Sequence, residues 1–218
     1  MDIVDPTVAR YVLDHCSPGE DDLLAELAAE TRERYPDSAG MQITADEGAL
    51  LAMLVRLCGA RDAVEVGVFT GYSSLWVARA LPGDGRLLAL DVSDEWTSLA
   101  RRYWERAGVV DRIELRLGPA ADALRALPDE PVLDFAFVDA DKEGYPTYYE
   151  EVVRRLRPGG LVVLDNVLRE GRVVDPAQQG PADAAIRRVN DAVVADTRVD
   201  SVMLPVRDGV TVARRRPA

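Results

Sequence analysis

The chain has 218 residues, of which 48% are hydrophobic and 29% charged, and its formal net charge at pH 7 is -12. This length suits one α/β domain with a buried sheet and is short for two. The strong negative charge argues against a nucleic-acid partner, because phosphate binding needs clustered Lys and Arg. No apolar run approaches the roughly 20 residues that span a bilayer, and the opening residues lack the apolar core of a secretory signal. We therefore expect a cytoplasmic protein without a membrane partner.

The first third of the chain is predicted to be helical. Residues 3–34 fit two helices that are interrupted at Ser17-Pro18-Gly19, and residues 35–40 fit a loop. The segment from Thr44 to Glu47 has the form of a capping box, in which the two side chains exchange bonds with the backbone at the start of a helix.

From residue 62 onward, short apolar strands alternate with helices. The strands are expected at 62–66, 86–91, 112–117, 132–138 and 160–165, and the helices at 73–81, 94–107, 119–127 and 145–156. A further helix at 181–196 precedes strands at 199–205 and 209–214, with Asp208-Gly209 predicting a hairpin between them. This order predicts a mostly parallel sheet that is covered by helices on both faces, with an antiparallel edge hairpin. We expect a single domain over 1–218, with N-terminal helices in 1–58 and the α/β core in 59–218.

The first two strand ends suggest a nucleoside-containing cofactor. Gly67 and Gly71 bracket a tight turn into a helix, where glycine lets the backbone approach a ligand closely. Asp91 ends the second strand, 24 residues after Gly67, and an acid at about this spacing can accept the hydroxyls of a ribose. Asp91 could instead cap the following helix. Together the loop and the acid favour the ribose.

The fourth and fifth strands end in oxygen-bearing side chains. Asp139 follows one strand, and Asp165 and Asn166 follow the next. Such an oxygen-only set suits Mg²⁺, Mn²⁺ or Ca²⁺ and leaves open positions for a substrate. Helix capping is the alternative for the two aspartates. Lys142, the only lysine in the chain, lies one turn from this cluster, where repulsion from a cation would favour the neutral amine and so a general base.

These residues together resemble the cation-dependent O-methyltransferases of the caffeoyl-CoA and catechol type. The resemblance runs from about Met41 to Arg214. Its motifs are Met41-Gln42-Ile43, Ala45-Asp46-Glu47-Gly48, Glu65 to Ser73, Gly118-Pro119-Ala120, Asp139 to Lys142, Asp165-Asn166, Leu204-Pro205 and Asp208-Gly209.

The resemblance implies a Rossmann-like methyltransferase fold with a seven-stranded sheet, usually in a dimer, and S-adenosylmethionine (SAM) as methyl donor. It implies the following cofactor-binding residues: Ile43, Glu65, Gly67, Val68, Ser73, Asp91, Ala120, Asp139 and Asp141. It assigns Asp139, Asp165 and Asn166 as ligands of a divalent cation, with Mg²⁺ favoured, and Lys142 with Asp139 as catalytic residues. The implied reaction is methyl transfer to one hydroxyl of a small catechol-type acceptor, in a homodimer without a nucleic-acid partner.

The substrate side departs from the family pattern. Met41, Tyr145, Tyr148 and Arg169 are candidates for the acceptor wall, with loop 166–181 as a possible lid. Arg169 stands where plant members place a tryptophan, so we hypothesise an acidic catechol that pairs with it. Packing of the two tyrosines and a solvent-facing arginine are the alternatives. The acidic N-terminal region is poorly suited to the polyphosphate of a coenzyme A thioester.

Three other functions are considered. A nicotinamide-dependent oxidoreductase would need the G-x-G-x-x-G spacing, which Gly67 and Gly71 do not have. A metal-dependent hydrolase would leave Asp91 without a role. A non-catalytic SAM-binding or dimerisation module would have no use for the metal set and Lys142.

Overall fold

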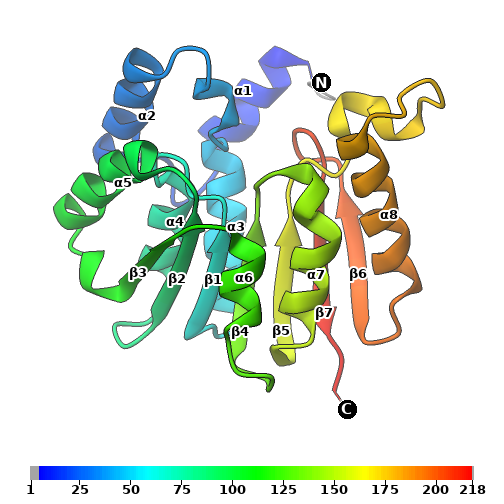
Figure 1. The fold of residues 1–218 in the computed structure, drawn as a ribbon. Helices are drawn as coiled ribbons and strands as arrows, with labels where there is room; N and C mark the ends of the chain where they lie inside the picture. The colour runs from blue at the N-terminus through cyan, green and yellow to red at the C-terminus, as the bar shows by residue number, and fades with distance from the viewer. Residues whose placement is uncertain (1–4, 218) are drawn as a thin grey trace.

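The computed structural model describes residues 5–217, and Figure 1 shows these as one sheet between two layers of helices. The α-helices are α1 (Pro6–Asp14), α2 (Asp22–Arg34), α3 (Ala45–Leu57), α4 (Tyr72–Ala80), α5 (Asp94–Arg106), α6 (Ala120–Arg125), α7 (Tyr145–Val153) and α8 (Pro181–Ala195). The strands are β1 (Asp62–Val66), β2 (Arg86–Asp91), β3 (Ile113–Leu117), β4 (Leu133–Val138), β5 (Leu156–Leu164), β6 (Val199–Leu204) and β7 (Val210–Arg215). Short 3-10 helices are η1 (Ala39–Met41), η2 (Val110–Arg112), η3 (Lys142–Gly144) and η4 (Arg169–Val174).

The seven strands follow the order β3-β2-β1-β4-β5-β7-β6. Neighbours from β3 to β5 are parallel, β7 is antiparallel to β5, and β6 is antiparallel to β7. The predicted mixed sheet with an edge hairpin is thus confirmed. The chain runs outward from β1 in one direction and from β4 in the other, and open sheets bind ligands at such a reversal of strand order.

Strand register brings three of the predicted site segments together. Val66 at the end of β1 pairs with Val138 at the end of β4, which pairs in turn with Leu164 at the end of β5. The next residues along each chain therefore emerge side by side at the same edge of the sheet. Parallel pairing alone thus places Gly67, Asp139 and Asp165 next to one another.

The sheet is buried because apolar side chains alternate between its two faces. One face packs with α2, α3, α4 and α5 into a core that contains Leu75, Trp104 and Phe135. The other face packs with α6, α7 and α8 around Val138, Val152 and Ile186. In Figure 1 the helices α6, α7 and α8 lie in front of the strands, and α3 lies behind them. No helix among residues 5–217 is long and apolar enough to cross a membrane.

The start of α3 differs from the predicted capping box. Thr44 is the N-cap residue, as predicted, but its side chain makes no capping hydrogen bond. Glu47 does not reach back to the helix start either: it has no exposed surface, and neither carboxylate oxygen has a hydrogen-bond partner among the described residues. The capping-box prediction is therefore right about where the helix begins and wrong about the two side chains.

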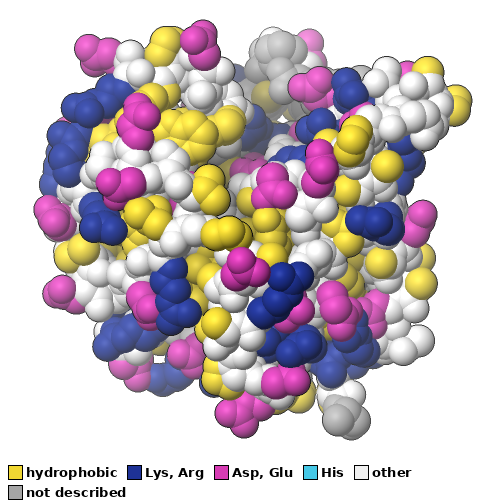
Figure 2. All heavy atoms as spheres, in the orientation of Figure 1, with side chains coloured by type: hydrophobic (Ala, Val, Ile, Leu, Met, Phe, Trp, Pro, Cys, Tyr) yellow, Lys and Arg dark blue, Asp and Glu magenta, His cyan; other side chains and the backbone are white. Residues whose placement is uncertain are grey.

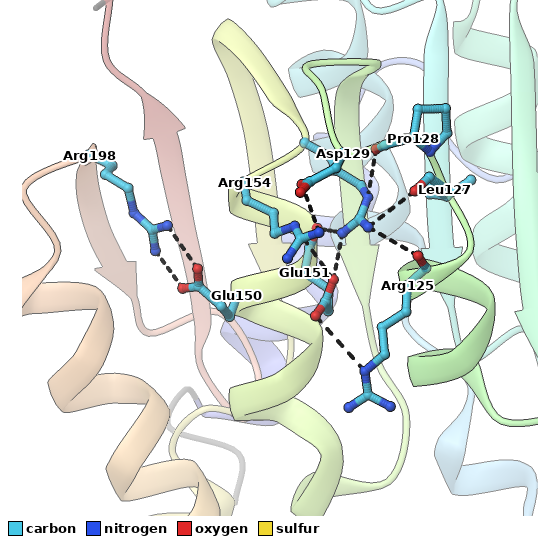
Figure 3. A network of polar contacts seen from close by, with 9 residues as sticks. Arg125, Leu127, Pro128, Asp129, Glu150, Glu151, Arg154 and Arg198 are labelled. Carbon is cyan, nitrogen blue, oxygen red and sulfur yellow. Dashed lines mark hydrogen bonds and ion pairs between the residues drawn. The ribbon is translucent and has the colours of Figure 1, made fainter.

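Figure 3 shows a network of polar contacts at the end of the sheet opposite the predicted site, with Arg125, Glu151 and Arg154 labelled. Within it, Arg155 has no exposed surface and donates to the backbone oxygens of Arg125, Leu127 and Pro128. It also donates to the backbone oxygen and the carboxylate of Glu151, at 2.9 and 2.5 Å. One side chain thus joins the end of α7 to the loop between α6 and β4.

Candidate active site at the carboxyl ends of the strands

A cavity of about 880 Å³ opens where the strands end. This volume is within the usual range of about 300–1,000 Å³ for small-molecule sites. In Figure 2 the hollow has hydrophobic side chains on its left wall and acidic and basic side chains on its right. Its lining includes these residues predicted for the cofactor, the cation or catalysis: Ile43, Gly67, Val68, Ser73, Asp91, Ala120, Asp139, Asp141, Lys142, Asp165 and Asn166.

The glycine loop between β1 and α4 is shaped by its contacts with protein. Gly67 has a φ of 91°, and a Cβ there would lie 1.9 Å from the backbone oxygen of Asp139. Gly71, with a φ of 85°, is the N-cap residue of α4, and a Cβ there would lie 2.6 Å from that of Ala100. Both glycines are therefore needed for packing as well as for backbone conformation, and their placement draws the loop down to the end of β4.

Asp91 holds the glycine loop in place. Its Oδ2 accepts hydrogen bonds from the amides of Val68 and Phe69 at 2.8 and 2.9 Å, and its Oδ1 accepts one from Ser93 at 2.8 Å. Helix capping by Asp91, the alternative weighed from the sequence, is not seen: Ser93 caps α5 by accepting from Trp96. A carboxylate has about four lone-pair positions, so Asp91 retains capacity for a further hydroxyl donor in the cavity.

Glu65 lies beneath the cavity wall rather than in it. Its side chain has no exposed surface; one oxygen accepts a hydrogen bond from Ser74, and the other has no partner among the described residues. Burial raises the pKa of Glu65 to about 8, although the neighbouring Ser73 and Ser74 side chains act in the opposite direction. The predicted cofactor contact is thus placed one layer below the cavity lining, next to Ser73, which does line it.

The predicted cation ligands come together as the strand register requires. Asp139, Asp165 and Asn166 all line the cavity. Burial, followed by the charge of the nearby Asp139 carboxylate, raises the pKa of Asp165 to about 7. Asn166 has a φ of 54°, a conformation that asparagine tolerates better than most residues. Two carboxylates and an amide that line one cavity fit a hard divalent cation, whose charge would relieve the repulsion between the acids.

Lys142 is held directly beside this group. Its amine donates hydrogen bonds to Asp139 Oδ1 at 2.9 Å and to the hydroxyl of Tyr145 at 2.7 Å. Tyr145 was predicted as part of the acceptor wall, but it has no exposed surface and lies outside the cavity lining. Burial raises the pKa of Tyr145 well above its ordinary value. The substrate-wall prediction for Tyr145 is therefore wrong, because its helix turns the ring into the core under Lys142.

The other candidates for the acceptor wall lie at the cavity. Met41, Tyr148 and Arg169 line it, and the hydroxyl of Tyr148 donates to Asp141 Oδ1 at 2.5 Å. Sequence reasoning missed Arg207, which also lines the cavity and donates to the backbone oxygen of Gln42 at 3.1 Å. Its position beside the Asp208-Gly209 turn was the available signal, since that turn lies at the same sheet edge.

The loop considered as a lid is well anchored. It contains η4, whose Arg172 pairs with buried Asp183 at the start of α8 through contacts of 3.0 and 2.6 Å. Arg169 approaches the same carboxylate less closely, with its Nε 3.4 Å from Asp183 Oδ1. Arg187 of α8 donates to backbone oxygens of this loop, among them that of Gln178. These contacts hold the loop against α8 in the conformation described.

The fold and the site together define a class of protein: an open α/β sheet with a small-molecule cavity at its switch point. Comparison with known proteins gives the family. The family model described as O-methyltransferase matches residues 14–216. The caffeoyl-CoA O-methyltransferase 2 of Zea mays is 42% identical over 218 residues, which cover 94% of this chain and 81% of the maize protein.

Solved structures give the same answer. The O-methyltransferase TomG from Streptomyces achromogenes, which is involved in tomaymycin synthesis and was solved with SAM, has a TM-score of 0.86 and 34% identity; the match covers 97% of this chain and 96% of TomG. The Bacillus cereus O-methyltransferase in complex with SAH has a TM-score of 0.87 and 34% identity, covering 96% and 97% of the two chains. The chain belongs to the O-methyltransferase family and is a SAM-dependent O-methyltransferase.

Proposed function

We propose that this O-methyltransferase depends on a divalent cation and methylates one hydroxyl of a small catechol-type acceptor. The observation that carries the proposal is the convergence of Asp139, Asp165 and Asn166 in the cavity, with the amine of Lys142 2.9 Å from Asp139. The cavity residues around Asp91 and Gly67 would hold SAM. The cation, Mg²⁺ before Mn²⁺ or Ca²⁺, would sit with the three oxygen ligands.

The proposed chemistry is a single displacement. SAM would supply a methyl group on a cationic sulfur, and a cation held by Asp139, Asp165 and Asn166 would supply Lewis acidity toward the acceptor hydroxyls. Lys142 takes the proton from the attacking hydroxyl; the new bond joins that oxygen to the methyl carbon, and the bond from carbon to sulfur breaks. The products are the methyl ether, S-adenosylhomocysteine and a proton on Lys142. The wall residues contribute alignment, which supplies up to roughly 7–11 kcal/mol in favourable intramolecular reactions.

The decisive test is methyl transfer from labelled SAM to a panel of catechols, with Mg²⁺ and with EDTA. We expect product only when the cation is present. In Asp165→Ala we expect activity and its cation dependence to be lost while SAM binding, measured by calorimetry, persists. Full turnover in EDTA, or normal turnover by Asp165→Ala, would refute the cation assignment. SAM binding without any product would favour a non-catalytic module or an acceptor outside the panel.

We further propose that the acceptor carries an acidic group that pairs with Arg169. Arg172 already pairs closely with Asp183, which leaves the charge of Arg169 only partly compensated at the cavity wall. An arginine so placed can hold a carboxylate through two hydrogen bonds. The curated maize relative is named for a coenzyme A thioester, so the panel pairs a free dihydroxycinnamic acid with its coenzyme A thioester and a neutral catechol.

The matched variants for this test are Arg169→Ala and Arg188→Ala. Arg188 is an exposed arginine on α8, outside the cavity lining. We expect Arg169→Ala to raise KM for the acidic catechol by about tenfold or more, which corresponds to about 1.4 kcal/mol, and to leave the neutral catechol unchanged. Arg188→Ala should affect neither acceptor. An equal rise in KM for acidic and neutral catechols in Arg169→Ala would contradict the proposed pairing of Arg169 with an acidic group.

The proposed assembly is a homodimer, as the resemblance implies. Exposed apolar side chains on α3 and β6, including Met53, Leu57 and Val202, offer surface for such a contact. Light scattering coupled to size-exclusion chromatography measures the mass directly, and the single-chain mass of 23.8 kDa would count against the dimer.

A further inference from the structure

The buried carboxylate of Glu47 has no hydrogen-bond partner within residues 5–217, and the packing of the fold gives no reason for its burial. It lies in the first turn of α3 with no exposed surface, and neither of its carboxylate oxygens has a hydrogen-bond partner among the described residues. Burying a carboxylate without partners costs several kcal/mol, so such a group persists where something else stabilises it. The capping role that its sequence position predicted is not taken up.

Glu47 lies close enough to the proposed cation ligands to feel their charge. Burial chiefly raises the pKa of Glu47 well above its ordinary value, and the charges of Asp165 and Asp139 add to this effect. Arg207 acts in the opposite direction, and its Nη1 lies 3.8 Å from Glu47 Oε2. The amine of Lys142 is engaged by Asp139 and Tyr145. Three acids thus share one low-dielectric region with incomplete compensation.

We infer that Glu47 is a third anionic group of the proposed cation site, acting from behind Asp139 and Asp165 to strengthen binding of the divalent cation. The inference rests on the cation dependence proposed above. Among residues 5–217 no three His, Cys, Asp or Glu side chains are gathered as direct ligands, so Glu47 acts at longer range. Glu47 does not line the cavity, so its effect on the cation is electrostatic and acts through the low-dielectric interior.

The position of Arg207 supports this assignment. Its guanidinium is directed to the backbone oxygen of Gln42 and approaches Glu47 only at 3.8 Å, without a hydrogen bond between them. A carboxylate whose role was to pair with Arg207 would be bound at about 2.7–2.9 Å. Arg207 is therefore not a close ion-pair partner of Glu47, and the carboxylate stays available to a cation at the strand ends.

The test is Mn²⁺ binding to the protein without SAM or acceptor, measured by calorimetry and by the loss of free Mn²⁺ signal in electron paramagnetic resonance. Removing a group that supports metal ligands usually lowers metal affinity about 10- to 100-fold. We expect a loss of this size in Glu47→Gln, which keeps the shape of the side chain and removes its charge. Glu47→Asp, which keeps the charge on a shorter side chain, should bind Mn²⁺ with intermediate affinity.

Asp46→Asn is the matched control, because it removes one charge from the same first turn of α3 at a half-buried position outside the cavity lining. We expect its Mn²⁺ affinity to equal that of the wild type, and SAM binding in EDTA to be unchanged in all three variants. Wild-type Mn²⁺ affinity in both Glu47 variants would overturn the inference and leave the proposed function standing. Absence of Mn²⁺ binding to the wild type would overturn both. A thermal midpoint in EDTA that falls in Glu47→Gln, with Mn²⁺ affinity kept, would mark a purely structural role.

Discussion

The amine of Lys142 donates a hydrogen bond of 2.7 Å to the hydroxyl of Tyr145, a residue that is wholly buried at the start of α7. That hydroxyl also lies 3.0 Å from the backbone oxygen of Asp165 and 3.2 Å from that of Val138. Because a hydroxyl has one proton, it accepts from the lysine and donates to these carbonyls. The Tyr145 hydroxyl therefore links Lys142 through hydrogen bonds to the ends of β4 and β5.

Tyr145→Phe removes the hydroxyl that bonds Lys142 and the two backbone carbonyls, and it changes no residue that lines the cavity. We expect kcat to fall about 10- to 100-fold, because a displacement of about 1 Å at a reacting group can cost a hundredfold. The KM for SAM should change little, since Tyr145 does not line the cavity. Tyr149→Phe is the control: its hydroxyl donates to Asp196 at the end of α8, and Tyr149 lies outside the cavity lining. A kcat for Tyr145→Phe equal to that of Tyr149→Phe would argue against a positioning role.

Lys142→Arg tests whether a removable proton is needed at this position. Arginine keeps the positive charge beside Asp139 but does not give up its proton at usable pH. General base catalysis contributes about 10²- to 10⁴-fold, so we expect kcat to fall by that amount while SAM affinity, measured by calorimetry, stays within about threefold. A variant with more than a tenth of wild-type kcat would show that charge, rather than proton transfer, is what Lys142 supplies.

Arg155→Met should destabilise the fold strongly. It removes the donor for three loop carbonyls and leaves Glu151 without its closest partner, and breaking a buried ion pair from one side costs about 3–5 kcal/mol. Arg154→Met is the comparison, because Arg154 is 37% exposed and its loss should cost less than about 1 kcal/mol. Urea unfolding followed by circular dichroism measures both. Equal midpoints would mean that the network in Figure 3 adds little to stability.

Asp196 should make folding stability depend on pH in the acid range. Hydrogen bonds from Arg198 chiefly lower its pKa to about 2, against an unfolded value of about 3.9. A depressed folded pKa contributes stability above the unfolded pKa, and this is lost as pH falls through the folded pKa. Asp196→Asn should therefore cost about 1–2 kcal/mol at pH 7, and the difference from wild type should shrink below about pH 4 and vanish near pH 2.

Asp200→Asn is the control for this pH effect, because the Asp200 side chain is 62% exposed where it pairs with Arg216. Its cost should be below about 1 kcal/mol at pH 7. A difference between Asp196→Asn and wild type that stays constant from pH 7 to pH 3 would show that the ion pair with Arg198 is not its source. Guanidinium chloride would screen such pairs, so urea is the denaturant to use.

The strand ends could be predicted from the sequence because the same patterns that define a parallel sheet also define its binding edge. The bounds of β2 were predicted correctly to the residue, and those of β1 likewise. Once these strands are parallel neighbours, residues such as Asp139 and Asp165 must meet. Local sequence patterns were enough to predict the binding edge, because parallel strands in register bring the residues that follow them to the same edge of the sheet.

The side chains that point inward were harder to predict. Glu47 fits a capping box in sequence, but only tertiary packing shows that its carboxylate turns toward Asp165. Tyr145 resembles a wall residue until the phase of α7 is known, and a shift of one residue on a helix rotates a side chain by about 100°. Arg207 lies in a turn that carries no periodic pattern, and its place in the cavity depends on the pairing of β6 with β7.

The three amide hydrogen bonds to Asp91 have a consequence for how the cofactor is recognised. Since Val68 and Phe69 are bound by the same carboxylate that faces the cavity, the glycine loop is ordered when the chain folds, before any ligand arrives. SAM then meets a preorganised wall, and little of its binding energy is diverted to immobilising the loop. An Asp91→Ala variant would accordingly report on two things at once: the loss of the proposed ribose partner and the release of the backbone that shapes the rest of the proposed cofactor site.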